Sequence, residues 1–65
     1  MIQLNGEPRQ APLGTSIATL LEIEGLADRR VAVEVNHEIV PKSLHRERLL
    51  LEGDRVEIVH ALGGG

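Results

Sequence analysis

The residues that could bind a metal ion are few and scattered. The three histidines, His37, His45 and His60, are not spaced like the ligands of a metal site, and the first two fall in predicted turns among charged residues. A zinc site needs several converging nitrogen, sulfur or oxygen ligands, and the chain has no cysteine. We therefore predict no metal site and interpret the histidines as solvated or structural residues.

Hydroxyl and carboxylate groups give no clearer sign of catalysis. Ser16 is better explained as a helix cap and Ser43 as a turn residue, because neither has an identifiable base and orienting acid. The glutamates of the predicted helix and strands are interpreted as solvated surface without a recognisable carboxylate pair: Glu22, Glu24, Glu34 and Glu57. The sequence therefore predicts a protein that is not itself an enzyme.

The chain ends in Gly63, Gly64 and Gly65. Terminal residues are commonly disordered, so a glycine tail can be without function. A chain end that lacks Cβ atoms can also enter a slot too narrow for other residues and present its α-carboxylate inside the active site of a partner. Under this second interpretation the carboxylate of Gly65 is the reactive group.

The elements that must position this tail begin with a predicted hairpin. Apolar and polar residues alternate over 1–5, which predicts a half-buried strand, and Asn5-Gly6 is the favoured pair for a two-residue hairpin turn. A second strand is expected over about 7–13. Its prolines limit how many ladder hydrogen bonds it can donate, so we place it at a sheet edge.

A short helix follows. Ile17, Leu20 and Leu21 recur at helical spacing and form one apolar stripe. Ser16 precedes them as the predicted N-cap, with its hydroxyl accepting from a backbone amide. Gly25 is expected to end the helix because glycine adopts the left-handed conformation readily.

The second half of the chain is richer in strand signals. Alternating valines over 31–35 give the strongest of these and predict an interior strand, which a hairpin turn connects to a strand over 38–40. Residues 42–51 lack a clean period, and we expect a turn or 3₁₀ piece followed by a brief strand. A last strand is predicted over 55–60, directly before the tail.

This order of elements indicates an α+β fold, with one main helix across one face of a mixed sheet of four to five strands. The arrangement is compatible with a β-grasp. A chain of 65 residues is one domain at most. We expect a single domain over 1–62 and a flexible tail over 63–65.

Charge and hydropathy narrow the possible partners. The formal net charge of −3 argues against binding to phosphate backbones, which requires an excess of Lys and Arg. No apolar run approaches the ~20 residues of a membrane span, and the first residues do not follow the pattern of a signal peptide. We therefore expect no nucleic-acid or membrane partner, and a cytoplasmic location.

Several segments, taken in order, are typical of one known family: Ile2-Gln3-Leu4-Asn5-Gly6, Ser16-Ile17 with Leu20-Leu21, Val31-Ala32-Val33-Glu34-Val35-Asn36, Ile39-Val40-Pro41, Gly53-Asp54-Arg55-Val56-Glu57-Ile58 and Gly64-Gly65. Over essentially the whole chain they resemble the ThiS family, the sulfur carriers of thiamine biosynthesis. The resemblance implies a ubiquitin-like β-grasp. The combination is specific, whereas a β-grasp layout alone would not separate the many users of this fold.

The resemblance also implies a reaction route. A ThiF-type adenylating enzyme uses ATP and magnesium to activate the carboxylate of Gly65, and sulfur from a cysteine desulfurase or similar system converts it to a thiocarboxylate. Thiazole synthase then takes the sulfur. This chain would bind no cofactor itself, Gly63 and Gly64 would provide clearance, and Leu62 and Val59 would contact partners.

Two other functions remain open. The small subunit of molybdopterin synthase resembles this chain in fold, diglycine end and thiocarboxylate chemistry, but such carriers tend to be longer and to contain aromatic residues, which this chain lacks. A β-grasp interaction module would bind a partner through its sheet and have no use for the tail.

Overall fold

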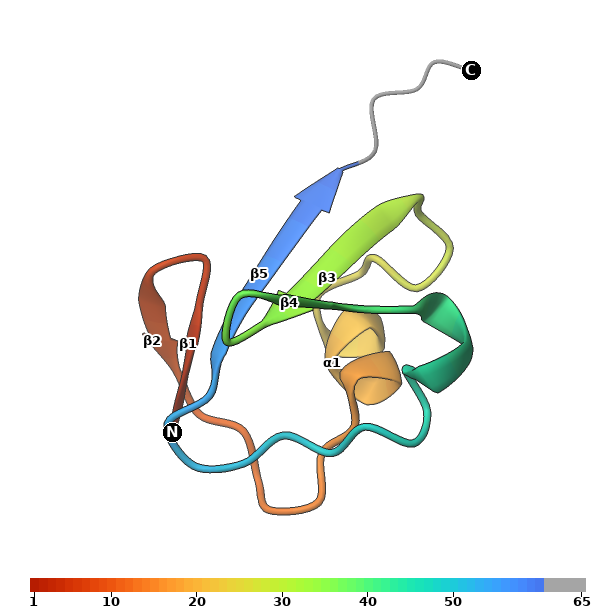
Figure 1. Cartoon of the computed structure of the whole chain (residues 1–65). Coiled ribbons are helices and arrows are strands. Elements are labelled where there is room, and N and C mark those ends of the chain that lie inside the picture. The colour runs from red at the N-terminus through yellow and green to blue at the C-terminus, as the bar shows by residue number, and fades with distance from the viewer. Residues whose placement is uncertain (61–65) are drawn as a thin grey trace.

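The computed structural model describes residues 1–60 and contains five strands, one α-helix and one 3₁₀ turn (Figure 1). In chain order they are β1 (Ile2–Leu4), β2 (Glu7–Arg9), α1 (Ile17–Ile23), β3 (Val31–Val35), β4 (Glu38–Val40), η1 (Lys42–Leu44) and β5 (Arg55–His60). This order confirms the predicted α+β class.

The strands form one mixed sheet in the order β2-β1-β5-β3-β4. The last strand, β5, lies in the middle of the sheet, parallel to β1 and antiparallel to β3. Strand β3 is interior and β2 is at an edge, as predicted. The second strand is shorter than the predicted range of 7–13, because the chain leaves the sheet after Arg9.

Both predicted hairpin turns are present. Asn5 and Gly6 have φ angles of 50° and 84°, and Asn36 and His37 have φ angles of 53° and 71°. Two successive residues with positive φ are characteristic of the turn whose twist matches that of paired strands. The Asn5 side-chain oxygen also accepts a hydrogen bond from the amide of Ile58 at 2.8 Å, which attaches the first turn to β5.

Helix α1 begins and ends at the predicted residues. The Ser16 hydroxyl accepts from the Thr19 amide at 3.1 Å and provides the N-cap. At the other end Gly25 has a φ of 75°, and the amide of Leu26 donates to the carbonyl of Leu21 at 2.8 Å. This pattern is a Schellman ending, which satisfies carbonyls that the helix would otherwise leave unpaired.

The apolar stripe of α1 packs on one face of the sheet and forms an entirely aliphatic core. Its buried members are Ile2, Leu4, Ile17, Leu20, Leu21, Val33, Val35, Leu50, Val56 and Ile58. Because side chains alternate across a strand, the residues between these core positions lie on the opposite face of the sheet, away from the helix.

The brief strand expected at the end of 42–51 is absent, and this prediction was wrong. After η1 the segment makes one isolated antiparallel bridge, between Leu49 and Ser16. The carbonyls of Arg48 and His45 accept from the amides of Ile17 and Ala18. The segment therefore provides acceptors for the free amides at the start of α1 instead of extending the sheet.

Candidate functional site

The strand that leads to the glycine tail is held on both sides. Its pairing with β3 runs from Val35 opposite Val56 to Val31 opposite His60. On the other side β1 pairs with its first half, through Leu4 opposite Val56. Strand β5 therefore stays in the ladder up to its last residue, His60, which pairs with Val31 (Figure 1).

The sequence predictions for the tail concern residues that the structure does not describe. The roles predicted for Leu62, Gly63, Gly64 and Gly65 therefore stay predictions, as does the domain boundary between 62 and 63. Val59 is described: it is 55% exposed and pairs with Ala32 of β3. It lies on the face away from α1, where a partner protein can reach it.

The face of the sheet that carries Val59 is mixed in character. Along β5, Arg55, Glu57 and Val59 alternate with the buried Val56 and Ile58. Ala32 and Glu34 of β3 lie opposite Val59 and Glu57 on the same face. The outer face therefore places an apolar strip next to a pair of carboxylates, close to the end of β5.

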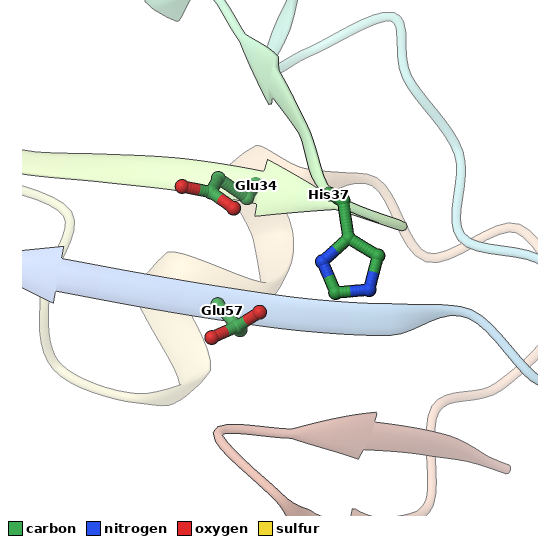
Figure 2. Close-up of side chains that lie close together, drawn as sticks. All are labelled: Glu34, His37 and Glu57. Atoms are coloured by element: carbon green, nitrogen blue, oxygen red, sulfur yellow. The ribbon is translucent and has the colours of Figure 1, made fainter.

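Glu34 and Glu57 are direct partners in the register of β3 and β5, and the turn residue His37 lies beside them (Figure 2). One potential ligand atom from each residue lies within 4.8 Å of the others. The prediction that these glutamates form no recognisable pair was wrong. They are separated by many residues in the chain, and only the register of two antiparallel strands brings them together.

Other predicted surface groups have structural roles. The Ser16 hydroxyl caps α1, and Ser43 lies in η1, as expected. Glu22 is exposed, whereas Glu24 forms an ion pair with Arg9. The capping contact of Ser16 and the place of Ser43 in η1 agree with the interpretation of both serines as structural residues.

His45 is buried, with 6% of its surface exposed, and its Nε2 lies 2.9 Å from the carbonyl oxygen of Val40. The contact joins the end of β4 to the segment after η1. Of the two interpretations given for the histidines, the structural one therefore applies here.

Sequence reasoning missed the role of Asp54, which directly precedes β5. This carboxylate is buried and accepts hydrogen bonds from the Leu51 amide at 2.8 Å, from Asn36 Nδ2 at 3.0 Å and from Arg48 at 3.3 Å. Burial alone would raise the pKa of Asp54, but these hydrogen bonds and the charge of Arg48 outweigh it and hold the pKa below 3.8. The group therefore joins the turn between β3 and β4 to the segment that precedes β5.

The signal for this role was an aspartate between a turn glycine and a strand. Such a residue can accept from nearby backbone amides, as Asp54 does from Leu51. Its longer-range partners Asn36 and Arg48 could not be assigned from spacing.

Within residues 1–60, no helix is long and apolar enough to cross a membrane.

Comparison with known proteins gives one consistent result. The model of the ThiS family matches residues 2–65. The sulfur carrier protein ThiS of Bacillus subtilis is 41% identical over 66 aligned residues, covering 100% of both chains. The crystal structure of the thiamine biosynthesis protein ThiS from Geobacter metallireducens superposes with a TM-score of 0.84 at 27% identity, covering 98% of this chain and 97% of that one.

A thiazole synthase of Magnetococcus marinus is 44% identical over 64 residues, which are 98% of this chain but 20% of that protein. The chain thus spans about a fifth of the length of this relative. The β-grasp sheet, the structural match and the family model, which extends from the first strand through the terminal glycines, agree, and the chain belongs to the ThiS family.

Proposed function

We propose that this protein is a sulfur carrier of thiamine biosynthesis and that its working group is the α-carboxylate of Gly65. The observation that carries the proposal is the family match through residue 65, together with full-length similarity to a protein named as a sulfur carrier. The chain acts as a carrier and not as a catalyst. Its role is to present an acyl group that other proteins activate and load.

The chemistry requires activation, because an ionised carboxylate repels nucleophiles and has no adequate leaving group. The carboxylate oxygen of Gly65 attacks the α-phosphorus of ATP, forming an acyl-adenylate and releasing pyrophosphate. A persulfide on the sulfur-donating partner then attacks the carbonyl carbon and AMP leaves, which forms an acyl disulfide between the two proteins. A second thiol cleaves the sulfur–sulfur bond, so that a thiocarboxylate remains on Gly65 and the two thiols are left as a disulfide. ATP and magnesium belong to a ThiF-type adenylating partner, so this chain needs no cofactor.

The absence of cysteine from the sequence supports the attachment of sulfur at the terminal carboxylate. The sequence contains no thiol on which the carrier could hold sulfur as a persulfide. The terminal carboxylate is therefore the group available for loading, with the sulfur supplied by a cysteine desulfurase or similar system.

Thiazole synthase is the proposed acceptor of the sulfur. The support is that a protein named thiazole synthase contains a ThiS-like part similar to nearly the whole of this chain. Two functions that occur within one polypeptide in a relative commonly act on each other when they occur on separate chains. Val59, exposed on the outer face of the sheet, and Leu62 are the proposed partner contacts.

The direct test is the intact mass of the protein isolated from cells that are making thiamine. The expected result is a fraction whose mass exceeds that of the unmodified chain by the difference between one sulfur and one oxygen atom, located by fragmentation at Gly65. Absence of this species during active thiazole synthesis would contradict the proposal.

A second test separates a carrier from an interaction module. Deleting Gly65 or appending one residue should abolish sulfur transfer while the thermal melting temperature stays unchanged, because the last residue contributes no side chain to the core. Equal transfer by the blocked variant would favour an interaction module. Transfer to a molybdopterin precursor instead of a thiazole precursor would identify the other carrier type.

Gly64→Ala tests the clearance that the tail needs in the slot of the adenylating partner. We expect adenylation to fall strongly and stability to remain unchanged, as measured by pyrophosphate release and by a thermal melt. Gly53→Ala is the matched control: Gly53 has a φ of 84° in the turn before β5, so the alanine should lower stability and leave adenylation at low temperature intact.

A further inference from the structure

The outer face of the sheet gathers three side chains that sequence spacing did not connect. Glu34 comes from β3, Glu57 from β5, and His37 from the turn between β3 and β4 (Figure 2). The potential ligand atoms of all three lie within 4.8 Å of one another. Two carboxylates and an imidazole therefore converge on one point.

The electrostatics of this point are unfavourable without a cation. Like charges directly opposite each other on neighbouring strands destabilise a sheet, and Glu34 and Glu57 are such a pair. Among residues 1–60 the ion pairs are Met1 with Glu52, Arg9 with Glu24 and Arg48 with Asp54, so neither glutamate takes part in one. The neighbouring imidazole adds a nitrogen ligand, which an acidic surface patch alone would not provide.

The positions of the three groups are set by the backbone. The two glutamates are fixed by the register of β3 against β5. His37 sits at a φ of 71° in a hairpin whose other central residue, Asn36, is tied to β5 through hydrogen bonds to Asp54 and from the Arg55 amide. A site whose ligands stand on paired strands and a fixed turn loses little backbone conformational entropy on binding, so the cost is confined to the three side chains.

We propose that Glu34, His37 and Glu57 bind a divalent transition-metal ion of the zinc class on the outer face of the sheet. One imidazole nitrogen and two carboxylate oxygens are ligands that zinc accepts, and they leave coordination positions open. The nitrogen ligand disfavours magnesium, which prefers oxygen donors. Both glutamates are half-buried and His37 is exposed, so the bound ion is reachable from solvent.

The binding test uses the full chain without an affinity tag, titrated with Zn²⁺ in a calorimeter and melted with and without Zn²⁺. We expect one site, and a melting temperature that rises by about 10 °C or more at a free zinc concentration of about 100 times the dissociation constant. Mg²⁺ should bind at least about tenfold more weakly.

The variants Glu34→Gln, Glu57→Gln and His37→Asn should each weaken zinc binding at least about tenfold, because each removes one of the three protein ligands. Asparagine keeps the positive φ at position 37 accessible, so the turn is preserved. His60→Asn and Glu38→Gln are matched controls, since both residues are exposed and lie outside the cluster. Both controls should bind zinc like the unaltered protein.

A nuclear magnetic resonance titration of the unaltered protein tests the site without any mutation. The imidazole signals of His37 should shift on adding Zn²⁺, while those of the exposed His60 and the buried His45 should not. No melting response to zinc, binding that survives all three ligand substitutions, or shifts confined to His60 would each overturn the proposal. The variant lacking Gly65 should bind zinc normally, so the result does not depend on the carrier function.

Discussion

Asp54 and the pair formed by Glu34 and Glu57 show two different ways of placing carboxylates on the same sheet. Asp54 is buried at the start of β5 and accepts hydrogen bonds from a backbone amide, an amide side chain and a guanidinium group. Glu34 and Glu57 are half-buried on the outer face and lie opposite each other, with no ion pair among the residues that the structure describes. The first carboxylate is committed to holding the fold, whereas the other two are available to an external cation.

Among the variants that test this comparison, Asp54→Ala should change the stability of the protein most. The change removes three hydrogen-bond interactions and leaves Arg48 beside a site without its negative charge, which should lower the free energy of unfolding by about 3 kcal/mol. Chemical denaturation at neutral pH measures it. Glu52→Ala is the control, because Glu52 is exposed and its ion pair with the N-terminus should contribute little. If Asp54→Ala and Glu52→Ala lower the free energy of unfolding equally, Asp54 does not have the special role in holding the fold that we assign to it.

A smaller effect is expected in the pH dependence of stability, where the stabilising contribution of Asp54 should be lost as the pH falls. The pKa of Asp54 is lower in the folded protein than its usual value of 3.8, so its contribution is present above pH 3.8 and is lost as the pH falls through the folded pKa. The stability difference between the unaltered protein and Asp54→Asn should therefore narrow below about pH 4. A difference that stays constant down to pH 2 would contradict the assigned pKa direction.

Glu34→Gln, measured with a chelator present to remove metal ions, should change the free energy of unfolding least. The change should be a stabilisation, whereas Asp54→Ala is expected to destabilise the protein. Removing one of two like charges across a strand pair should raise the free energy of unfolding by up to about 0.5 kcal/mol. When zinc is added, the unaltered protein should become more stable than Glu34→Gln, which reverses the order of stability of the two proteins. If Glu34→Gln destabilises the metal-free protein, the two glutamates do not repel each other and the contrast with Asp54 fails.

Local patterns predicted most of the elements correctly. The Asn5-Gly6 and Asn36-His37 turns, the Ser16 cap and the Gly25 ending each depend on the conformational preference of one or two residues, and these preferences act within a few positions. The prediction of a strand before residue 52 was wrong, because the amides and carbonyls of that segment pair with residues at the start of α1 and not with another strand. A local pattern carries no information about such a partner.

The candidate sites also include features that local sequence predicts and features that depend on distant segments. Val59, which the resemblance implied as a partner contact, is exposed, and the terminal glycines can be read directly from the sequence. The network of Asp54 and the convergence of Glu34, His37 and Glu57 could not be predicted, because each joins segments whose relative positions depend on register.

The sequence by itself determined the apolar stripe of the helix, the turns, the helix and the family, because these depend on side-chain type, short-range periodicity and order along the chain. Only the tertiary structure decided the register that places two distant glutamates opposite each other. The physical reason is that strand order and register are set by burying one shared core. That choice brings together polar groups on the other face whose spacing in the chain gives no sign of it.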